Sequence, residues 1–578
     1  MNVPGPHVLR DYAMVADGER GALVGPRGDL SWLCFPRWDS GSVFASLVGG
    51  RSCYLVEPTG RYVWGGYYEP DSLIWRNRWV TESGLVECRD ALRYPAEADR
   101  AVLLRRITAL DGPVSMRVEL RPRADYDRQP LTDLEHHNGC WSGRLGGLHL
   151  RWWCGPGARS QEHGEALQLR LDLPPGESHD LVLELATRPP QDELPPPGEM
   201  WRATDTAWQQ SVPDLANCVA PSDTRHTYAV LRGMTSTGGG MVAAATTSLP
   251  ERAEAGRNYD YRYVWIRDQC YAGQAAAAAG TEPLLDAAVQ FVSERLLEHG
   301  DRMAPAYTTQ GTAIPDQRHI SLPGYPGGYD LVGNWVVKQF QLDAFGEALL
   351  LLASAGSRDR LGVEHWKAAE IAASAIEKRW QQPDAGIWEI DNRPWTHSRL
   401  TAAAGLRAIA AAAPRTPTVA GWLSLADRIT ADTDRTSLHS SGRWQRSPDD
   451  PAVDGALLLP ALRGAVPPDD PRSLATLDCY LRDLTLDGYA YRFRHDQRPL
   501  PEAEGSFLLC GFLVALSLHR IGRPVEARGW FERTRSACGP PQLLSEEYDP
   551  FEHQQRGNLP QAFVHALLLE TSVRLAED

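Results

Sequence analysis

The pattern of hydrophobic positions along the chain changes once, near residue 195. Before that point, short apolar runs are separated by Gly, Pro and Asp, and several of them alternate apolar with polar residues. Alternation with a period of two is typical of strands with one buried face. The clearest runs are 31–35, 53–56, 73–75, 102–107, 114–120 and 148–154. Many short strands with turn residues between them predict an antiparallel β-sandwich over residues 1–195.

A proline-rich segment then interrupts the pattern. Residues 189–198 read Pro-Pro-Gln-Asp-Glu-Leu-Pro-Pro-Pro-Gly, which suits neither a strand nor a helix. We therefore predict a linker with a short helix over residues 196–222.

Beyond the linker, over residues 223–578, the pattern becomes helical. Many candidate helices are so rich in Ala and Leu that they are apolar on more than one face, as helices packed between other helices are. The candidates are 224–233, 270–279, 284–299, 335–355, 363–380, 400–413, 420–432, 455–462, 472–484, 507–521, 524–537 and 561–575. About twelve helices would form six helical hairpins. An all-helical toroid gathers its connecting loops at its ends, and there we expect a functional site.

Composition and charge narrow the class of protein. A chain of 578 residues exceeds what one hydrophobic core usually organises, so at least two domains are expected. Its 43% apolar and 23% charged residues are those of an ordinary globular protein. The net charge of −15 argues against a nucleic-acid or anionic-membrane partner.

The chain also carries few signs of export or metal binding. The first residues contain no charged segment followed by an apolar run, and no segment approaches the roughly 20 apolar residues that span a bilayer. Ten cysteines are scattered from Cys34 to Cys538 without a Cys-x-x-Cys pair. They are typical of small buried residues in a reducing compartment. We expect a cytoplasmic protein with no disulfide framework, no metal site and no cofactor.

Residues 257–268 are the first segment with candidate chemistry. Aromatic rings beside charged groups suit a sugar, because its C–H faces stack on rings and its hydroxyls need hydrogen-bonding partners. The same composition is also typical of a buried Arg–Asp pair that supports a loop among core aromatics. The candidate binding residues in this segment are Tyr261, Tyr263, Trp265, Arg267 and Asp268.

Two further segments each offer a glutamate. Glu389 follows Trp388 and a Gly turn, where loss of solvent would raise its pKa and suit a general acid. Glu546 lies in Leu-Leu-Ser-Glu-Glu-Tyr-Asp over residues 543–549, between apolar helices. Taken alone, Glu389 is more typical of an ordinary glutamate at a helix start, and Glu546 is more typical of a solvated acidic loop. Taken together, they meet a requirement of glycosidic hydrolysis, which needs one protonated and one ionised carboxyl on a rigid, aromatic-walled frame.

Seven motifs extend this interpretation to a family. They occupy residues 11–39, 258–268, 333–334 with 341–347, 386–389, 504–510, 545–549 and 557–563. In this order they resemble glycoside hydrolase family 15, the glucoamylases and their bacterial glucoamylase/trehalase relatives. The resemblance implies a β-sandwich followed by an (α/α)6 barrel, and hydrolysis with inversion at the anomeric carbon.

The resemblance also implies roles for individual residues. Glu389 falls on the general acid and Glu546 on the general base. Arg267 and Asp268 would bind the hydroxyls of the terminal glucose. The remaining implied sugar contacts are Tyr261, which would also touch the attacking water, and Tyr263, Trp265, Trp388 and Arg494. A closed site for one non-reducing glucose would make the enzyme exo-acting on a carbohydrate substrate.

Two segments depart from the family pattern. Residues 320–332 lack an arginine-rich stretch that bacterial relatives carry, and residues 390–398 lack a glycine pair. Both would border the leaving group, so starch ends, maltooligosaccharides, α-1,6-linked glucosides, trehalose and natural-product glycosides all remain candidate substrates. Two other functions also remain open. An inverting phosphorylase would use phosphate in place of water and the base, and a non-catalytic glucoside-binding protein would keep the fold alone.

Overall fold

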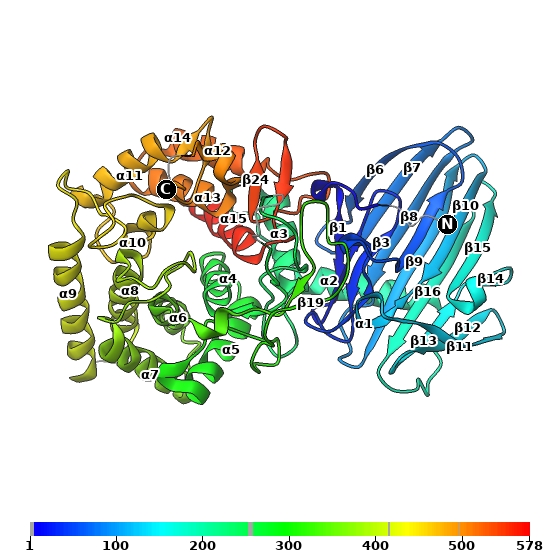
Figure 1. Cartoon of the computed structure of the whole chain (residues 1–578), viewed down its shortest axis with the longest axis horizontal. Coiled ribbons are helices and arrows are strands. Elements are labelled where there is room, and N and C mark those ends of the chain that lie inside the picture. Colours follow the sequence, from blue (N-terminus) through cyan, green and yellow to red (C-terminus); the bar gives the residue numbers. More distant parts are fainter. Residues whose placement is uncertain (1–4, 253–257, 414–416, 496–497, 578) are drawn as a thin grey trace.

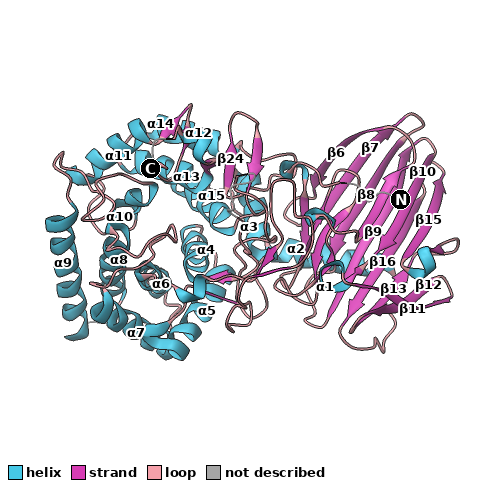
Figure 2. Ribbon diagram, in the orientation of Figure 1, coloured by secondary structure: helices cyan, strands magenta, loops and turns pink. Residues whose placement is uncertain are grey.

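A computed structural model of the chain describes residues 5–252, 258–413, 417–495 and 498–577. A β-rich N-terminal region and a helical C-terminal region lie side by side along the long axis of the molecule (Figure 1). Figure 2 shows the strands gathered in one half and the helices in the other. The predicted fold class is confirmed: an antiparallel β-sandwich is followed by a helical barrel.

The N-terminal region consists of two eight-stranded sheets in its described residues. The first has the order β1-β2-β3-β5-β10-β15-β14, with β4 on β3, and the second has the order β11-β12-β13-β16-β9-β8-β7-β6. The strands are β1 (Ala13–Ala16), β2 (Gly21–Val24), β3 (Leu30–Cys34), β4 (Ser42–Phe44), β5 (Cys53–Pro58), β6 (Tyr62–Tyr68), β7 (Trp75–Thr81), β8 (Leu85–Leu92), β9 (Arg100–Asp111), β10 (Val114–Arg121), β11 (Gln129–His137), β12 (Cys140–Leu145), β13 (Leu148–Trp153), β14 (Arg159–Gln161), β15 (Ala166–Leu173) and β16 (Ser178–Ala186). Their inward-facing residues form one apolar core that includes Trp75, Trp79 and Trp152.

The helical region is a ring of helices inside a second ring. In the described residues, the inner ring is α4 (Ile266–Ala278), α6 (Leu342–Gly356), α8 (Thr396–Ala412), α10 (Leu459–Leu462) with the 3-10 turn Gly455–Leu458, α13 (Leu508–Arg520) and α15 (Ala562–Arg574). Each inner helix contacts the next, and α15 closes the ring on α4. The outer helices are α3 (Pro221–Gly233), α5 (Pro283–His299), α7 (Val363–Arg379), α9 (Pro417–Ser437), α11 (Pro471–Asp483) and α14 (Pro524–Arg535).

Short elements occupy the loops between these helices. They are the helix α12 (Leu500–Ala503) and the strands β17 (Val264–Trp265), β18 (Ala306–Tyr307), β19 (Arg318–His319), β20 (Leu331–Val332), β21 (Thr485–Leu486), β22 (Tyr489–Ala490), β23 (Ser506–Phe507), β24 (Glu547–Asp549) and β25 (Gln554–Arg556). Strands β17 and β23 lead directly into the first turns of α4 and α13. A further short helix, α1 (Ala124–Asp127), lies in the N-terminal region between β10 and β11.

Burial on all sides explains the composition of the inner helices. Helices α6 and α13 are buried along almost their whole length, which agrees with their Ala- and Leu-rich sequences. Helix α6 begins at Leu342 and not at residue 335 as predicted. The residues before it form the 3-10 turn Val336–Lys338, because the Asn334 side chain accepts the Val336 N–H at 2.9 Å.

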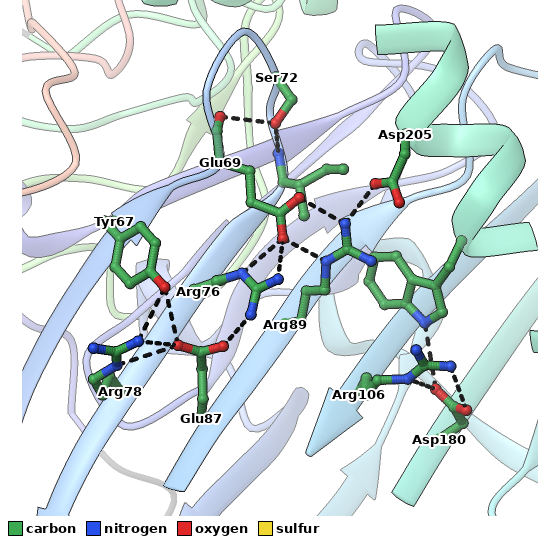
Figure 3. Close-up of polar contacts among 12 residues, drawn as sticks. Tyr67, Glu69, Ser72, Arg76, Arg78, Glu87, Arg89, Arg106, Asp180 and Asp205 are labelled. Carbon is green, nitrogen blue, oxygen red and sulfur yellow. Dashed lines mark hydrogen bonds and ion pairs between the residues drawn. The ribbon is translucent and has the colours of Figure 1, made fainter. Parts of the chain in front are cut away.

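A linker helix, α2 (Pro197–Ser211), packs on the outer face of the second sheet. Figure 3 shows the polar contacts there: Arg89 on β8 donates to Asp205 on α2 and to Glu69. The Arg89 guanidinium lies 4.3 Å from the ring centre of Trp201, whose indole N–H donates to Asp180 on β16. The linker is therefore bound to the sandwich over its helical part.

Within the described ranges, no helix combines the length and the apolar character needed to cross a membrane. All ten cysteines are free thiols.

One buried ion pair gives a test of the sandwich. Arg105 on β9 donates to Asp90 on β8 at 2.8 Å, and neither side chain is exposed. Asp90→Ala leaves a buried cation without its partner, so we expect the free energy of unfolding to fall by about 3–5 kcal/mol. Thermal and urea denaturation measure this. Glu97→Ala breaks the exposed Arg93–Glu97 pair and serves as the control, with an expected change below about 1 kcal/mol.

Candidate active site

A cavity of about 300 Å³ lies where the inner helices α4, α6, α8, α13 and α15 begin. Its walls come from the loops that lead into these helices, so segments far apart in sequence meet there. The lining residues are Ala243, Glu251, Tyr259, Tyr261, Trp265, Arg267, Asp268, Tyr271, Asn334, Trp335, Ile387, Trp388, Glu389, Ile390, Arg492, Phe493, His495, Phe507, Leu509, Glu546, Gln561 and Phe563.

Tyr261 and Trp265 enter the cavity from an extended segment before α4. This segment is held by main-chain bonds: the Ala244 N–H donates to the Tyr261 carbonyl at 2.9 Å, and Ala243 donates to Tyr263 at 2.8 Å. Tyr263, predicted to contact the sugar, is not among the residues that line the cavity. Its side chain is 1% exposed and packs behind the cavity wall, in a small apolar cluster with Ala306, Ile314 and Val336.

Arg257, the first residue of that candidate segment, lies outside the described residues.

Glu389 stands at the end of a tight turn before α8. Its backbone is left-handed, with φ of +54°, and its N–H donates to the Gly386 carbonyl at 3.3 Å. A side chain other than glycine rarely adopts this conformation, and such residues are common at functional sites.

Three donors converge on one oxygen of Glu389. Its Oε1 accepts the Trp265 indole N–H at 2.8 Å, the Arg267 guanidinium at 3.1 Å and the Gln341 amide at 3.2 Å. These donors come from two different loops, so the position of the carboxyl group is fixed from outside its own turn.

The turn that carries Glu389 is anchored below by buried carboxylates. Asp384 accepts the Gly386 N–H at 2.6 Å and the Ser398 hydroxyl at 2.9 Å, and burial raises its pKa. The indole N–H of Trp388 donates to Asp454 at 3.1 Å. Trp388 therefore has a fixed orientation in the cavity wall.

Glu546 comes from a different part of the chain, directly before β24, and is 4% exposed. Its Oε1 accepts the Tyr261 hydroxyl at 3.4 Å, whereas Oε2 is buried and has no hydrogen-bond donor among the described residues. Burial raises the pKa of Glu546 well above its usual value, and repulsion from Glu251 raises it further, while Arg492 lowers it.

Arg492 balances a cluster of buried carboxylates behind Glu546. It donates to Glu504 at 2.8 Å and to Glu251 at 3.2 Å, and lies 3.5 Å from Glu547. One cation thus neutralises part of the negative charge at this side of the cavity, which reduces but does not remove the effect of burial on Glu546.

Arg267 and Asp268 form the floor at the start of α4, and both are buried. Besides Glu389, Arg267 donates to Gln341 at 2.9 Å and to Asp343 at 3.3 Å. Burial raises the pKa of Asp268 to about 7, although the charge of Arg267 lowers it. Near neutral pH this carboxyl group can either donate or accept a hydrogen bond.

Seven of the nine candidate residues from the sequence line this one cavity, namely Glu389, Glu546, Tyr261, Trp265, Arg267, Asp268 and Trp388. Arg494 does not line it, whereas its neighbour Arg492 does. Arg494 is exposed and donates to the Asp483 carbonyl at 2.9 Å. Arg492 points inward because buried carboxylates surround its guanidinium group. The described contacts of Arg494, at the surface, include no carboxylate.

Several lining residues were missed although they lie inside the motifs already noted. These are Tyr259, Asn334, Ile387, Phe507, Leu509, Gln561 and Phe563. Trp335, which follows one motif, gave a signal only by its position. Glu251, Tyr271 and His495 carried no sequence signal. Of the two departing segments, 320–332 contributes no residue to the lining, whereas 390–398 contributes Ile390.

Within the described residues, no group of three or more His, Cys, Asp or Glu side chains is arranged to hold a metal ion.

The buried carboxyl of Glu546 predicts a pH-dependent cost to stability. Its folded pKa is raised, so its ionisation opposes folding once the pH exceeds the unfolded value of about 4.3. We expect Glu546→Gln to have wild-type stability near pH 4 and to become more stable than wild type as the pH rises to 8. Urea denaturation across this range measures the difference. A variant equally or less stable than wild type at pH 8 would contradict the assignment of the cost to this group.

Comparisons with known proteins identify the family of this chain. The family model described as "Glycosyl hydrolases family 15" matches residues 225–573, which is more than half of the chain. A second model, "Trehalase-like, N-terminal", matches residues 5–141.

Similar proteins and a solved structure resemble this chain over nearly its whole length. A trehalase of Mycobacterium tuberculosis is 28% identical, over 98% of this chain and 89% of the relative. Trehalase 1 of Sulfolobus acidocaldarius is also 28% identical, over 97% and 98%. The crystal structure of a bacterial glucoamylase complexed with acarbose has a TM-score of 0.74 and 14% identity, covers 100% of this chain and 96% of its own, and supports the fold. The chain belongs to glycosyl hydrolase family 15 and is a glycoside hydrolase.

Proposed function

We propose that the chain is an inverting, exo-acting α-glucoside hydrolase that releases β-glucose from a non-reducing end. The observation that carries this proposal is the pair of carboxyl groups in one cavity, Glu389 and Glu546, each with different partners. An inverting reaction needs two carboxyl groups with different tasks, about 6.5–9.5 Å apart, so that a water fits between one of them and the sugar.

Glu389 suits the general acid. With its proton on Oε2, it would protonate the glycosidic oxygen of the leaving group. The resulting carboxylate would be stabilised by the three N–H groups that converge on Oε1, from Trp265, Arg267 and Gln341. Hydrogen bonds that strengthen as charge develops favour the transition state over the bound substrate.

Glu546 suits the general base. The Tyr261 hydroxyl orients its Oε1, and its Oε2 is available to a water molecule. As a carboxylate with a raised pKa, Glu546 would be a stronger base than a solvated glutamate. It would take a proton from the water that attacks the anomeric carbon on the face opposite the leaving group.

The closed end of the cavity supports exo action. Among its described lining residues, the exposed ones are Trp335 and Ile390, at 39% and 38%. Arg267 and Asp268 lie buried and would bind the hydroxyls of one terminal glucose. Ile390 directly follows the proposed acid, so the leaving group would extend past Ile390 and Trp335 toward solvent.

Trehalose is the first substrate to test. The relatives named trehalase align over nearly the whole of this chain and most or all of their own length. In trehalose, one glucose would occupy the closed end and the other would lie at the exposed mouth. We also keep the cytoplasm as the proposed location, supported by ten free cysteines.

The acid and base assignments predict severe losses of activity. Glu389→Gln and Glu546→Gln should each lower kcat at least about 10³-fold on the best substrate, because each removes a proton transfer. The assay follows glucose release from trehalose, maltose, maltotriose, isomaltose and panose, and NMR identifies the first anomer formed. The exposed Glu552→Gln, in the same hairpin as Glu546, is the matched control and should retain wild-type rates.

The two variants and the anomer also define what would refute the proposal. An α-glucose product, or wild-type turnover by both variants, contradicts inverting hydrolysis. Turnover that requires phosphate and yields a sugar 1-phosphate identifies a phosphorylase instead. Binding of glucosides without turnover by the wild-type chain identifies a non-catalytic protein.

The mouth of the cavity gives a separate prediction about the leaving group. Trp335→Ala removes apolar surface against which a second sugar would pack, worth about 1.4 kcal/mol, so KM for a disaccharide should rise about tenfold. Inhibition by free glucose, which would bind at the closed end, should change less than about twofold. Equal weakening of both would place Trp335 at the glucose site and not at the mouth.

A further inference from the structure

The segment that carries Tyr261 also reaches into the β-sandwich. Along its extended backbone, Tyr259 and Tyr261 line the cavity, while Asp260 and Arg262 between and after them are completely buried on the opposite side. Successive side chains of an extended chain point to opposite faces, so one face of the segment serves the site and the other serves the domain interface.

Arg262 binds the sandwich through most of its guanidinium group. One terminal nitrogen donates to the Ser40 carbonyl at 2.9 Å and to the Trp38 carbonyl at 3.2 Å. The other donates to the Tyr126 hydroxyl at 3.0 Å. The guanidinium also lies 5.7 Å from the ring centre of Trp32. Every one of these partners belongs to the N-terminal domain.

Asp260 neutralises the buried cation and ties it to a second cavity loop. Arg262 donates to the two carboxylate oxygens of Asp260 at 2.8 and 2.7 Å, a two-point contact that fixes the plane of both groups. Asp260 also accepts the Gly333 N–H at 2.9 Å, and its carbonyl accepts the Asn334 amide at 3.3 Å. Asn334 and its neighbour Trp335 line the cavity.

A second contact supports the same segment from the sandwich. The Trp32 indole N–H donates to the Ala245 carbonyl at 3.0 Å. Ala245 follows the residues whose N–H groups hold Tyr261 and Tyr263 in place. The sandwich thus fixes both the extended segment and the chain beside it.

We propose that Arg262 is a positioning residue through which the β-sandwich sets the geometry of the active site. It fixes the backbone on which Tyr261 meets Glu546 and Trp265 meets Glu389, without touching the substrate itself. The sandwich is then a working part of the catalytic unit and not only an attached domain.

The energetics agree with a role in geometry more than in stability. A fully buried ion pair loses much of its attraction to the cost of desolvation, so it is a weak source of stability. It does impose one arrangement of donors and acceptors, because any displacement leaves a buried charge unpaired. A displacement of about 1 Å in a catalytic group costs about 10²-fold in rate.

The test compares Arg262→Lys with a matched buried pair. Lysine keeps the charge but cannot make the forked contacts of Arg262. We expect kcat/KM to fall about 10²-fold, mostly in kcat, at an unchanged folded fraction, and the acidic limb of the pH profile to shift because Tyr261 contacts Glu546. Hydrogen exchange of the amides in residues 258–268 should become faster.

Arg105→Lys is the control, because Arg105 pairs with Asp90 and is equally buried, but lies within the sandwich. It should lose stability while keeping kcat/KM, the pH profile and exchange of residues 258–268 at wild-type values. Tyr126→Phe removes one acceptor of Arg262 with little change of shape. It should lower kcat/KM about fivefold, and it decides the case if Arg262→Lys does not fold.

The inference is overturned if Tyr126→Phe and a folded Arg262→Lys keep kcat/KM within twofold of wild type, or if Arg105→Lys reproduces their losses. The inference rests on the proposed hydrolase activity only where rates are measured, because hydrogen exchange needs no turnover. If the wild-type chain hydrolyses no α-glucoside, the proposed function fails, and exchange of residues 258–268 in the three variants still decides the role of Arg262.

Discussion

The carboxyl group of Glu546 is buried beside Glu251, where loss of solvent opposes its ionisation. A carboxylate in this position is poorly solvated, and the fold tolerates it only if the surrounding groups limit the repulsion. Arg492 supplies the compensating charge, and the Tyr261 hydroxyl supplies one hydrogen bond. The loops around Glu546 are therefore constrained by electrostatics as much as by packing. Burial of apolar side chains in the two large cores offsets the unfavourable free energy of these buried charges.

The two carboxyl groups of the site are held by different kinds of support. Glu389 is oriented by three donors to a single oxygen and by a turn whose backbone is left-handed. Glu546 keeps one buried oxygen without a donor among the described residues. The two carboxyl groups therefore differ in the number of hydrogen-bond donors around them. Arg267 belongs to the first group of contacts and Arg492 to the second, so the two arginines are not interchangeable.

The domain interface shows that a structural and a functional interpretation of one segment can both hold. The composition of residues 257–268 was compatible with a sugar site or with a buried Arg–Asp pair. The structure contains the pair, as Asp260 and Arg262, and places Tyr261 and Trp265 of the same segment on the cavity. Alternating side chains allow both, because each face of an extended chain meets a different neighbour.

The sequence by itself determined the fold class and most of the candidate residues that line the cavity, because hydrophobic period depends on local burial and the motifs keep their order along the chain. It also predicted most helices to within a few residues. Only the tertiary structure decided which of Arg492 and Arg494 faces the cavity, since both occupy the same alternating pattern and differ only in the carboxylates around them. The same holds for Tyr263. It lies two residues after Tyr261 and should share its face of the extended chain, but it packs in an apolar cluster behind the cavity wall. Contacts with residues hundreds of positions away decide which of two side chains with the same local pattern faces the cavity. The local sequence pattern does not contain this information.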